Sequence, residues 1–385
     1  MKMAQRTLYV ITVLATTVLV AASAQRTLAD GLPDSFTQTN LVSDIPGLAA
    51  TTDPQLVNPW GVSFGPATPF WVSDNGTGLA TIYNGNGVKQ GLVVTIPPPL
   101  GGVSPAAPTG QVFNPNPSDF GGSHFIFATE DGTISAWSSG TSAALQVTST
   151  AVYKGLALGT NGGNTLLYAT NFLTGKVDVF DNKFSPTTLA GGFVDPNLPA
   201  GYAPFNIQNI NGKLYVTYAL QDATHHDDIA GAGHGFVDVF STNGVLLQRL
   251  ISNGPLNSPW GIAVAPSGFG KFGGDLLIGN FGDGTINAFD ASTGAFLGKL
   301  DGSNGMPLIN QGLWDLSFGN GAHGSSTSDL FFTAGIPGNG NIEDHGLFGK
   351  IDETSVQTPE PGILYLALAG MALRGLISNS RRLRA

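Results

Sequence analysis

Two similar nine-residue segments lie far apart in this chain and constrain its fold more than any other feature. Residues 58–66 read NPWGVSFGP and residues 258–266 read SPWGIAVAP, so each places a Pro-Trp-Gly step before alternating apolar residues. Alternation with a period of two is typical of a β-strand. The two segments are 200 residues apart. That distance equals five units of about 40 residues, and self-similarity at such a period indicates a repeat architecture.

The stretch 258–300 shows what one unit contains. Apolar runs at 260–264, 275–279, 285–290 and 295–300 predict four strands, separated by segments rich in Gly, Pro, Ser and Asp. The Asp283-Gly284 step favours a tight hairpin, because glycine accepts a positive φ. Four antiparallel strands in about forty residues predict one blade of a β-propeller.

Similar units recur and predict an all-β, six-bladed β-propeller over residues 30–353. The predicted third strands DGTISAW, TGKVDVF, HGFVDVF, DGTINAF and HGLFGKI share a glycine followed by alternating apolar residues. A seventh blade would have to be split from 88–111, whose prolines oppose strand pairing. The last blade has only three strands of its own, because 354–361 is polar and contains proline. We expect the strand-like segment 36–43 to complete it, since closure covers an exposed edge.

Composition excludes several classes of protein and of site. The 54 glycines and 24 prolines of the 385 residues require many turns, whereas 42% hydrophobic residues exclude a disordered chain. A formal net charge of −10 opposes binding to a nucleic-acid backbone, so no nucleic-acid partner is expected. The absence of cysteine excludes disulfides, thiolate metal sites and cysteine nucleophiles.

The N-terminus has the features of a secretory signal peptide. Lys2 and Arg6 precede an apolar run at 8–22, and Ala22-Ser23-Ala24 fits a small-x-small cleavage site. We therefore predict a signal peptide over 1–24, with cleavage as late as 29 as the alternative. A membrane anchor is the other interpretation, but the run is short for a span of about 20 residues. Export predicts a location in the periplasm, on the cell surface or outside the cell.

The C-terminus is predicted as a linker and a three-part tail over 354–385. Pro359-Glu360-Pro361 comes first, an apolar segment follows at 363–377, and an arginine cluster at 381–384 closes the chain. This order resembles the PEP-CTERM sorting tail of exported bacterial proteins. The resemblance implies transient anchoring in the inner membrane, as a transmembrane helix, and removal by an exosortase-type membrane enzyme.

The tail departs from this resemblance in one respect. Arg374 interrupts the apolar segment after 363–373. Eleven residues make a helix of roughly 16 Å, against a hydrocarbon core of ~30 Å. A plain amphipathic tail is therefore the alternative interpretation.

Taken together, the NPWG and SPWG strands and this tail resemble an uncharacterised family of exported bacterial propellers that often carry PEP-CTERM. The blades are also distantly similar to NHL-type and gluconolactonase-type six-bladed propellers. The first resemblance implies no activity. The second implies a metal at the channel with Glu, Asn and Asp ligands, but no ligand position transfers to this chain.

The order of strands in a blade places one set of polar turns on one face of the ring. In an antiparallel meander, the loop after the second strand lies on the same face as the start of the first. The candidates on this face are Asp74, Asn75, Glu130, Asp131, Asn171, Asp222, Asn280 and Asp283. Their oxygen atoms suit a hard divalent cation such as Ca²⁺. Ordinary turn chemistry is the alternative, because hairpins need Asp, Asn and Gly.

Two longer insertions, 219–235 and 334–346, fall on the same face. They supply the candidate metal ligands His225, His226, Asp227, Asp228, Asp344 and His345. Histidine with carboxylate can bind a transition metal or provide a general base. Two solvated polar loops are the alternative. Trp60, Trp260 and Trp314 are expected to pack between blades, with stacking on a sugar ring as the other interpretation.

Two functions remain compatible with the sequence, and whether the protein is an enzyme stays open. The first is an exported binding or interaction module at the cell surface or in extracellular matrix, with a polysaccharide or protein partner. The alternative is a metal-dependent hydrolase or lyase of the lactonase kind, with its site on the face that carries the second-to-third strand loops.

Overall fold

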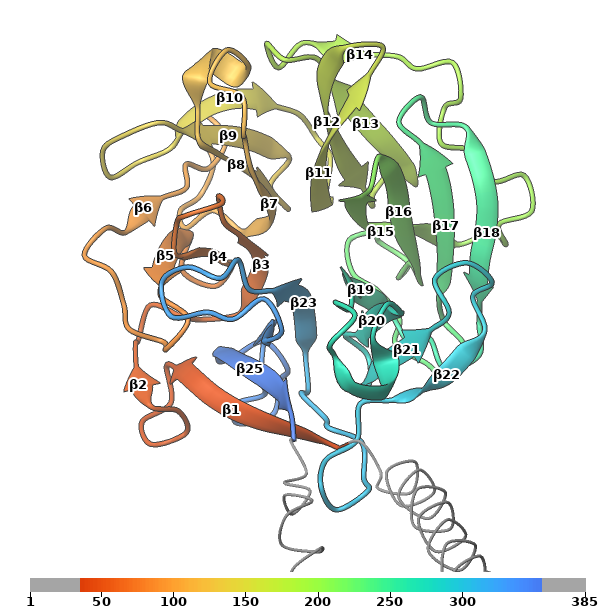
Figure 1. Ribbon diagram of the computed structural model, residues 1–385. Coiled ribbons are helices and arrows are strands. Elements are labelled where there is room, and N and C mark those ends of the chain that lie inside the picture. The colour runs from red at the N-terminus through yellow and green to blue at the C-terminus, as the bar shows by residue number, and fades with distance from the viewer. Residues whose placement is uncertain (1–34, 355–385) are drawn as a thin grey trace, which may run out of the picture. The chain divides into compact units, whose positions relative to one another are not determined.

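Six sheets follow one another around a central axis in residues 35–354, the part of the chain that the computed structural model describes (Figure 1). Five sheets consist of four antiparallel strands that are consecutive in sequence, and the sixth combines strands from both ends of the described chain. Two short 3-10 helices, η1 (Phe120–Gly122) and η2 (Gly270–Phe272), lie in turns. The predicted all-β, six-bladed propeller is confirmed.

The strands lie close to the positions predicted from the sequence, and the strands of each blade follow one another from the axis outward. Blade one is β3 (Pro59–Ser63), β4 (Phe70–Asp74), β5 (Leu79–Tyr83) and β6 (Val94–Thr95). Blade two is β7 (Pro108–Phe113), β8 (Phe125–Thr129), β9 (Thr133–Trp137) and β10 (Ala144–Thr148). Blade three is β11 (Tyr153–Asn161), β12 (Asn164–Asn171), β13 (Lys176–Phe180) and β14 (Pro186–Thr187). Blade four is β15 (Tyr202–Ile210), β16 (Lys213–Leu220), β17 (Phe236–Ser241) and β18 (Leu246–Ser252). Blade five is β19 (Pro259–Val264), β20 (Leu276–Asn280), β21 (Ile286–Phe289) and β22 (Phe296–Lys299).

Blade six closes the ring. Its own strands are β23 (Leu313–Phe318), β24 (Leu330–Ala334) and β25 (Leu347–Glu353), and β1 (Phe36–Ser43) pairs antiparallel with β25. The two-residue strand β2 (Thr51–Thr52) then runs parallel to β1. The Phe36 ring is buried, with its centroid 4.9 Å from that of Phe269 and 6.0 Å from that of Phe272 in blade five. The expected completion of the last blade by residues 36–43 is therefore confirmed.

Each innermost strand bends at the same point, which explains the recurring Pro-Trp-Gly step. The pairing of the first with the second strand shifts register near its start in all six blades. A side chain on Gly61 would meet the carbonyl oxygen of Thr109 at 2.7 Å, and one on Gly261 would meet that of Trp314 at 2.7 Å. Glycine is needed because neighbouring blades approach each other there to backbone distance.

Apolar side chains fill the interfaces between the blades, and a separate cluster occupies the axis. This apolar core at the axis includes the aromatic rings of Trp60, Phe172, Phe205, Trp260, Phe281 and Trp314. Because each ring comes from the inner end of a blade, the centre of the propeller is a packed core at this level.

Several predictions concern residues that the structure does not describe. The signal peptide over 1–24, its later cleavage position at 29, and the sorting tail with Pro359, Glu360 and Pro361 lie outside the described residues. Within 35–354, no helix is long and apolar enough to cross a membrane.

Substitution of Phe36 by alanine should open the ring closure. The change removes a buried ring from the interface with blade five and should lower the free energy of unfolding by about 3–5 kcal/mol. Chemical denaturation of the full chain measures this loss. Phe296→Ala is the matched control, because Phe296 on the outer strand β22 is half exposed and should cost about 1 kcal/mol or less. Equal losses in both variants would contradict the closing role of β1.

Candidate functional site

One residue near the start of each of the six innermost strands contributes to a ring around the axis. At equivalent positions these residues are Trp60, Thr109, Lys154, Phe205, Trp260 and Trp314. Trp60 and Trp314 stack with ring centroids 3.4 Å apart, and Trp60 meets Trp260 edge to face at 6.0 Å. All three tryptophans are at most 2% exposed, which confirms the packing interpretation and leaves no ring face for a sugar.

Lys154 is the charged member of this ring, and it is only 2% exposed. Its ammonium forms an ion pair with Glu130, lies 3.6 Å from Oδ1 of Asp227, and sits 5.1 Å from the centroid of the Trp60 ring. Burial alone would lower the pKa of Lys154, but attraction to Glu130 and Asp227 outweighs burial and raises the pKa above its usual value. The ammonium therefore stays charged inside an aromatic environment.

A chain of hydrogen bonds extends from Glu130 across blades one and six. Nδ2 of Asn75 donates to Oε2 of Glu130 at 2.9 Å, and Nδ2 of Asn58 donates to Oδ1 of Asn75 at 3.3 Å. The same Asn58 nitrogen donates to Oε1 of Glu343 at 2.9 Å, while Oδ1 of Asn58 accepts from the indole of Trp314 at 2.9 Å. These polar residues lie where the axis opens on one face of the ring, which we call the mouth. They are thus fixed to the aromatic core beneath them.

The carboxylates at the mouth outnumber the ammonium that compensates them. Burial, together with repulsion from Glu130, raises the pKa of Glu343 to about 7, although Asn58 and Lys154 act in the opposite direction. Burial also raises the pKa of Asp228, against the effects of Ser258 and Lys154. Glu343 is therefore only partly ionised near neutral pH, and among residues 35–354 Lys154 is the one ammonium that pairs with these carboxylates.

The backbone is strained at positions that hold these side chains. Asn58 and Ser258, which precede the prolines of the Pro-Trp-Gly steps, have φ values of 45° and 46°. Glu343 has a φ of 76°. Non-glycine residues rarely adopt positive φ, and such strain persists only where the surrounding structure enforces it.

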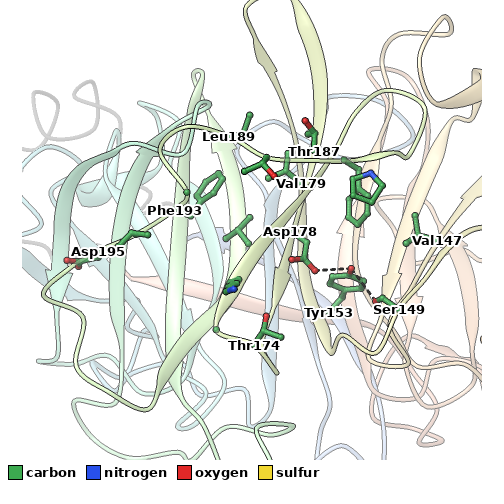
Figure 2. A pocket seen from close by; sticks show the side chains of 18 of the residues that line it. Val147, Ser149, Tyr153, Thr174, Asp178, Val179, Thr187, Leu189, Phe193 and Asp195 are labelled. Carbon is green, nitrogen blue, oxygen red and sulfur yellow. Dashed lines mark hydrogen bonds between the residues drawn. The ribbon is translucent and has the colours of Figure 1, made fainter.

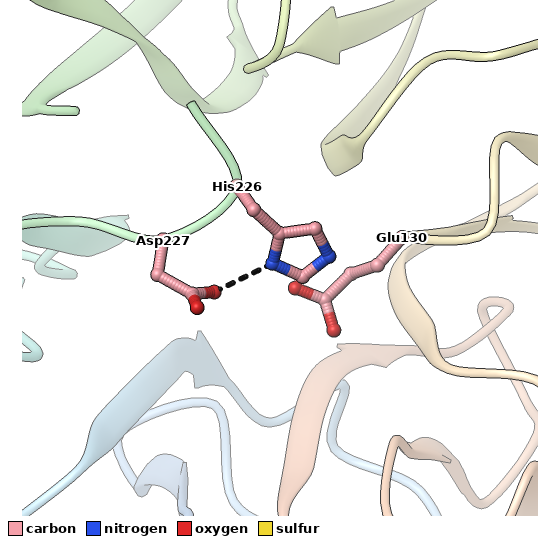
Figure 3. A group of neighbouring side chains, drawn as sticks. All are labelled: Glu130, His226 and Asp227. Atoms are coloured by element: carbon pink, nitrogen blue, oxygen red, sulfur yellow. Dashed lines mark hydrogen bonds and ion pairs between the residues drawn. The ribbon is translucent and has the colours of Figure 1, made fainter. Parts of the chain in front are cut away.

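Three potential metal ligands, Glu130, His226 and Asp227, lie close together (Figure 3). Donor atoms of Glu130, His226 and Asp227 all lie within 4.8 Å of one another, and Nδ1 of His226 is 2.8 Å from Oδ1 of Asp227. One imidazole and two carboxylates form a donor set that transition metals accept. Because the Lys154 ammonium is bound to Glu130 and faces Asp227, a metal ion would have to compete with it.

Of the candidates predicted on the second-to-third strand face, only some lie at the mouth. Asn75 and Glu130 belong to the mouth described above. Asp74 is buried in blade one, where it accepts hydrogen bonds from the Thr81 amide and hydroxyl. The others bond within or next to their own turns, and these are Asp131 with Ala107, Asn171 with Asp178, Asp222 with Thr224, and Asn280 and Asp283 with Thr285.

The two insertions approach each other at the mouth through Asp227 of 219–235 and Glu343 of 334–346. Asp227 and Glu343 interact electrostatically with each other and with Lys154. His225 instead lies 3.3 Å from the Leu173 carbonyl oxygen, and His345 lies 2.6 Å from Oδ2 of Asp44. The remaining candidates, Asp228 and Asp344, lie near Ser258 and against Gly338, respectively.

Sequence reasoning missed Lys154, Asn58 and Glu343. The signal for Lys154 was present, because Tyr-Lys-Gly in blade three takes the place of Pro-Trp-Gly in blades one and five. A lysine in a register position reserved for a buried aromatic residue requires a partner. Glu343 lies in the insertion that supplied the candidates Asp344 and His345, but no feature of the sequence distinguishes it from these neighbours.

Removal of the Lys154 charge should destabilise the protein through Glu130. Lys154→Met should lower the free energy of unfolding by about 3 kcal/mol, because a poorly exposed carboxylate loses its counter-ion. Adding Glu130→Gln should restore at least half of the loss, and chemical denaturation of the full chain measures both. Lys176→Met, on an exposed lysine of the same blade, is the control and should change little. If the loss of unfolding free energy in the double variant equalled the sum of the losses in the two single variants, the result would contradict a stabilising buried ion pair.

Comparison with solved structures supports the fold alone. The soluble aldose sugar dehydrogenase of Escherichia coli, in its apo form, matches with a TM-score of 0.52 at 12% identity, covering 83% of this chain and 100% of that one. A structural genomics protein of unknown function from Bacteroides thetaiotaomicron matches with a TM-score of 0.53 at 11% identity, covering 84% of this chain and 77% of that one.

Comparison of sequences gives closer relatives. No family model matches the chain. The uncharacterized protein R648 of Acanthamoeba polyphaga mimivirus is 33% identical over 337 residues, which cover 82% of this chain and 80% of the relative. The uncharacterized protein L690 of the same virus is 32% identical over 316 residues, covering 76% of this chain and 80% of the relative. The chain therefore belongs to the propeller family that includes these two mimivirus proteins.

Proposed function

We propose that the chain is an exported binding protein whose ligand binds at the mouth of the axis through a positively charged group. The binding residues form the axial cluster, which consists of Asn58, Asn75, Glu130, Lys154, His226, Asp227 and Glu343. The observation that supports this proposal most directly is the convergence of charged side chains from four different blades on one point. Such convergence of polar groups over an apolar floor is typical of a ligand site.

The charge balance of the axial cluster indicates the kind of ligand. Three carboxylates, on Glu130, Asp227 and Glu343, face the single ammonium of Lys154. Repulsion among them contributes to the raised pKa of Glu343, so a second positive charge at the mouth would relieve that repulsion. A primary amine and a divalent cation share this chemistry, and both are compatible with the exterior of a cell.

Titration calorimetry of the full chain tests the proposal and separates the two sources of charge. One arm uses calcium chloride, and the other uses a tetramer of glucosamine, with the neutral N-acetylated tetramer as its control. We expect calcium to bind more tightly at pH 8 than at pH 6, because Glu343 ionises around pH 7 and attracts a cation only when ionised. The glucosamine arm is compared with its neutral control at a single pH near 7, because the sugar amines themselves lose protons as the pH rises. We expect Glu343→Gln to weaken binding about tenfold in whichever arm binds.

Asp344→Asn is the matched control, because Asp344 follows Glu343 on the same insertion but is exposed and packs against Gly338. It should leave the affinity unchanged. Failure of both probes to bind, or equal affinity in Glu343→Gln and the parent chain, would contradict a cationic ligand at the axial cluster.

A metal-dependent hydrolase or lyase of the lactonase kind is the second candidate function. It is favoured by the three donor atoms of Glu130, His226 and Asp227 within 4.8 Å. A resident metal there would supply Lewis-acid chemistry, and elemental analysis of the purified full chain tests for it. One bound equivalent that disappears in His226→Ala would favour this function over the first. A metal-free protein that binds the tetramer of glucosamine would favour the first.

The proposed location depends on the two ends of the chain. We propose that an exosortase-type enzyme processes the tail after export, on the basis of the Pro359-Glu360-Pro361 motif and the arginine cluster at 381–384. Deletion of 359–385 should change where the mature protein accumulates, as measured by fractionation of the producing cells. An unchanged location would contradict the sorting function of the tail.

A further inference from the structure

The outer edge of blade three carries a cavity that is separate from the axial cluster (Figure 2). Its volume is about 770 Å³, within the range of about 300–1,000 Å³ typical of ligand pockets. One wall comes from the end of β10 in blade two, and the other from the segment 188–198 and Tyr218 of blade four. The floor between these walls is the edge of β13.

The cavity exists because the fourth strand of blade three is too short. The strand β14 pairs only with Val179 and Phe180 and is as short as β6 of blade one, whereas the equivalent strands β10 and β18 pair over four and five positions. Within the described chain, no strand pairs with the outer edge of β13 at residues 176–178. The fourth strand of blade three therefore consists of Pro186–Thr187 alone.

The free part of this edge offers backbone hydrogen bonds to the cavity. On the outer edge, the amide of Asp181 donates to the carbonyl oxygen of Ser185 at 2.9 Å. Alternate residues of an antiparallel strand direct both backbone groups to the same edge, so Val179 and Val177 share this direction. The N–H and C=O of Val177 therefore face the space that a longer β14 would have filled.

The two walls differ in chemistry. On the side of blade four, Val177 and Val179 pack with Phe193 and Leu198 of the segment 188–198. On the side of blade two, Asp178 accepts a hydrogen bond from the hydroxyl of Tyr153 at 3.1 Å, and Asp178 forms no ion pair within residues 35–354. The slot is therefore apolar on one side and acidic on the other.

The wall on the side of blade four is anchored. Asp195 forms an ion pair with Arg249 of β18, and Nη1 of Arg249 donates to the carbonyl oxygen of Asn197 at 3.0 Å. The amide of Phe193 donates to the carbonyl oxygen of Gly244 at 3.0 Å. Such a slot is preorganised, which lowers the entropic cost of binding.

We propose that an extended peptide segment of a partner protein binds in this slot and adds to β13 as a strand. Its backbone pairs with Val177, its apolar side chains lie against Phe193 and Leu198, and a basic side chain faces Asp178. Strand addition supplies affinity through main-chain hydrogen bonds and specificity through alternate side chains. The chain already uses a strand from a distant segment in this way, since β1 completes blade six.

Fluorescence anisotropy with the full chain tests the proposal. The probe is a fluorescein-labelled peptide in which valine alternates with lysine and threonine over nine residues. The control peptide has the same sequence with N-methylated central residues, which cannot pair with a strand edge. We expect saturable binding of the first peptide only. Val177→Pro removes the N–H from the edge and should weaken binding about tenfold, as should Asp178→Asn.

Leu297→Pro is the matched control variant, because Leu297 lies half exposed on the outer strand of blade five. It should bind the peptide as the parent chain does. If Val177→Pro does not fold, hydrogen exchange of the parent chain replaces it, and the amide of Val177 should become protected when the peptide is added.

Three results would overturn the proposal. They are no saturable binding up to about 1 mM, equal binding of the N-methylated peptide, and peptide binding without protection of the Val177 amide. A dimer in sedimentation experiments that Val177→Pro disrupts would assign the edge to a second copy of this chain instead.

Discussion

The close approach of six inner strands around the axis is the constraint on which the rest of this structure depends. Four of the six strands place glycine at the point of closest approach, whereas blades four and six place Asn206 and Asp315 there. These two side chains bond to the next blade instead, since Nδ2 of Asn206 donates to the Trp260 carbonyl oxygen at 2.8 Å and Oδ2 of Asp315 accepts from the Val62 amide at 2.7 Å. At the point of closest approach, each inner strand therefore carries either glycine or a side chain that forms a hydrogen bond with the backbone of the next blade.

This geometry also explains the electrostatics of the mouth. Because each blade delivers one side chain to the same small space, aromatic rings fill it efficiently, and Lys154 is placed among them. A charge in such surroundings is stable only with a partner, which Glu130 supplies from the neighbouring blade. Asp227 and Glu343 then add negative charge from the insertions, and burial with repulsion from Glu130 raises the pKa of Glu343. The mouth therefore has more carboxylates than ammonium groups, because Lys154 needs Glu130 as its partner and the two long loops each add a further carboxylate.

The sequence was sufficient for the blades because their signals are local. Strand alternation and Asp-Gly turns recur at a fixed period, and the lack of a fourth strand in blade six predicted the role of β1. The axial cluster was less accessible, because it joins residues 130, 154, 227 and 343 across the ring. Glu130 and Asp227 were separate candidates, and no periodicity indicates that they meet at one ammonium. The short β14 was also missed, since the turn residues at 181–188 do not reveal where pairing stops.

Blade three has a lysine at its inner end and a short outer strand at the other, and the start of β11 contacts both regions. Tyr153 and Lys154 are consecutive residues at the start of β11, where its pairing with β12 shifts register. Lys154 reaches the axial cluster, while the hydroxyl of Tyr153 bonds to Asp178 in the wall of the outer cavity. The start of β11 therefore contacts both the axial cluster, through Lys154, and the wall of the outer cavity, through Tyr153.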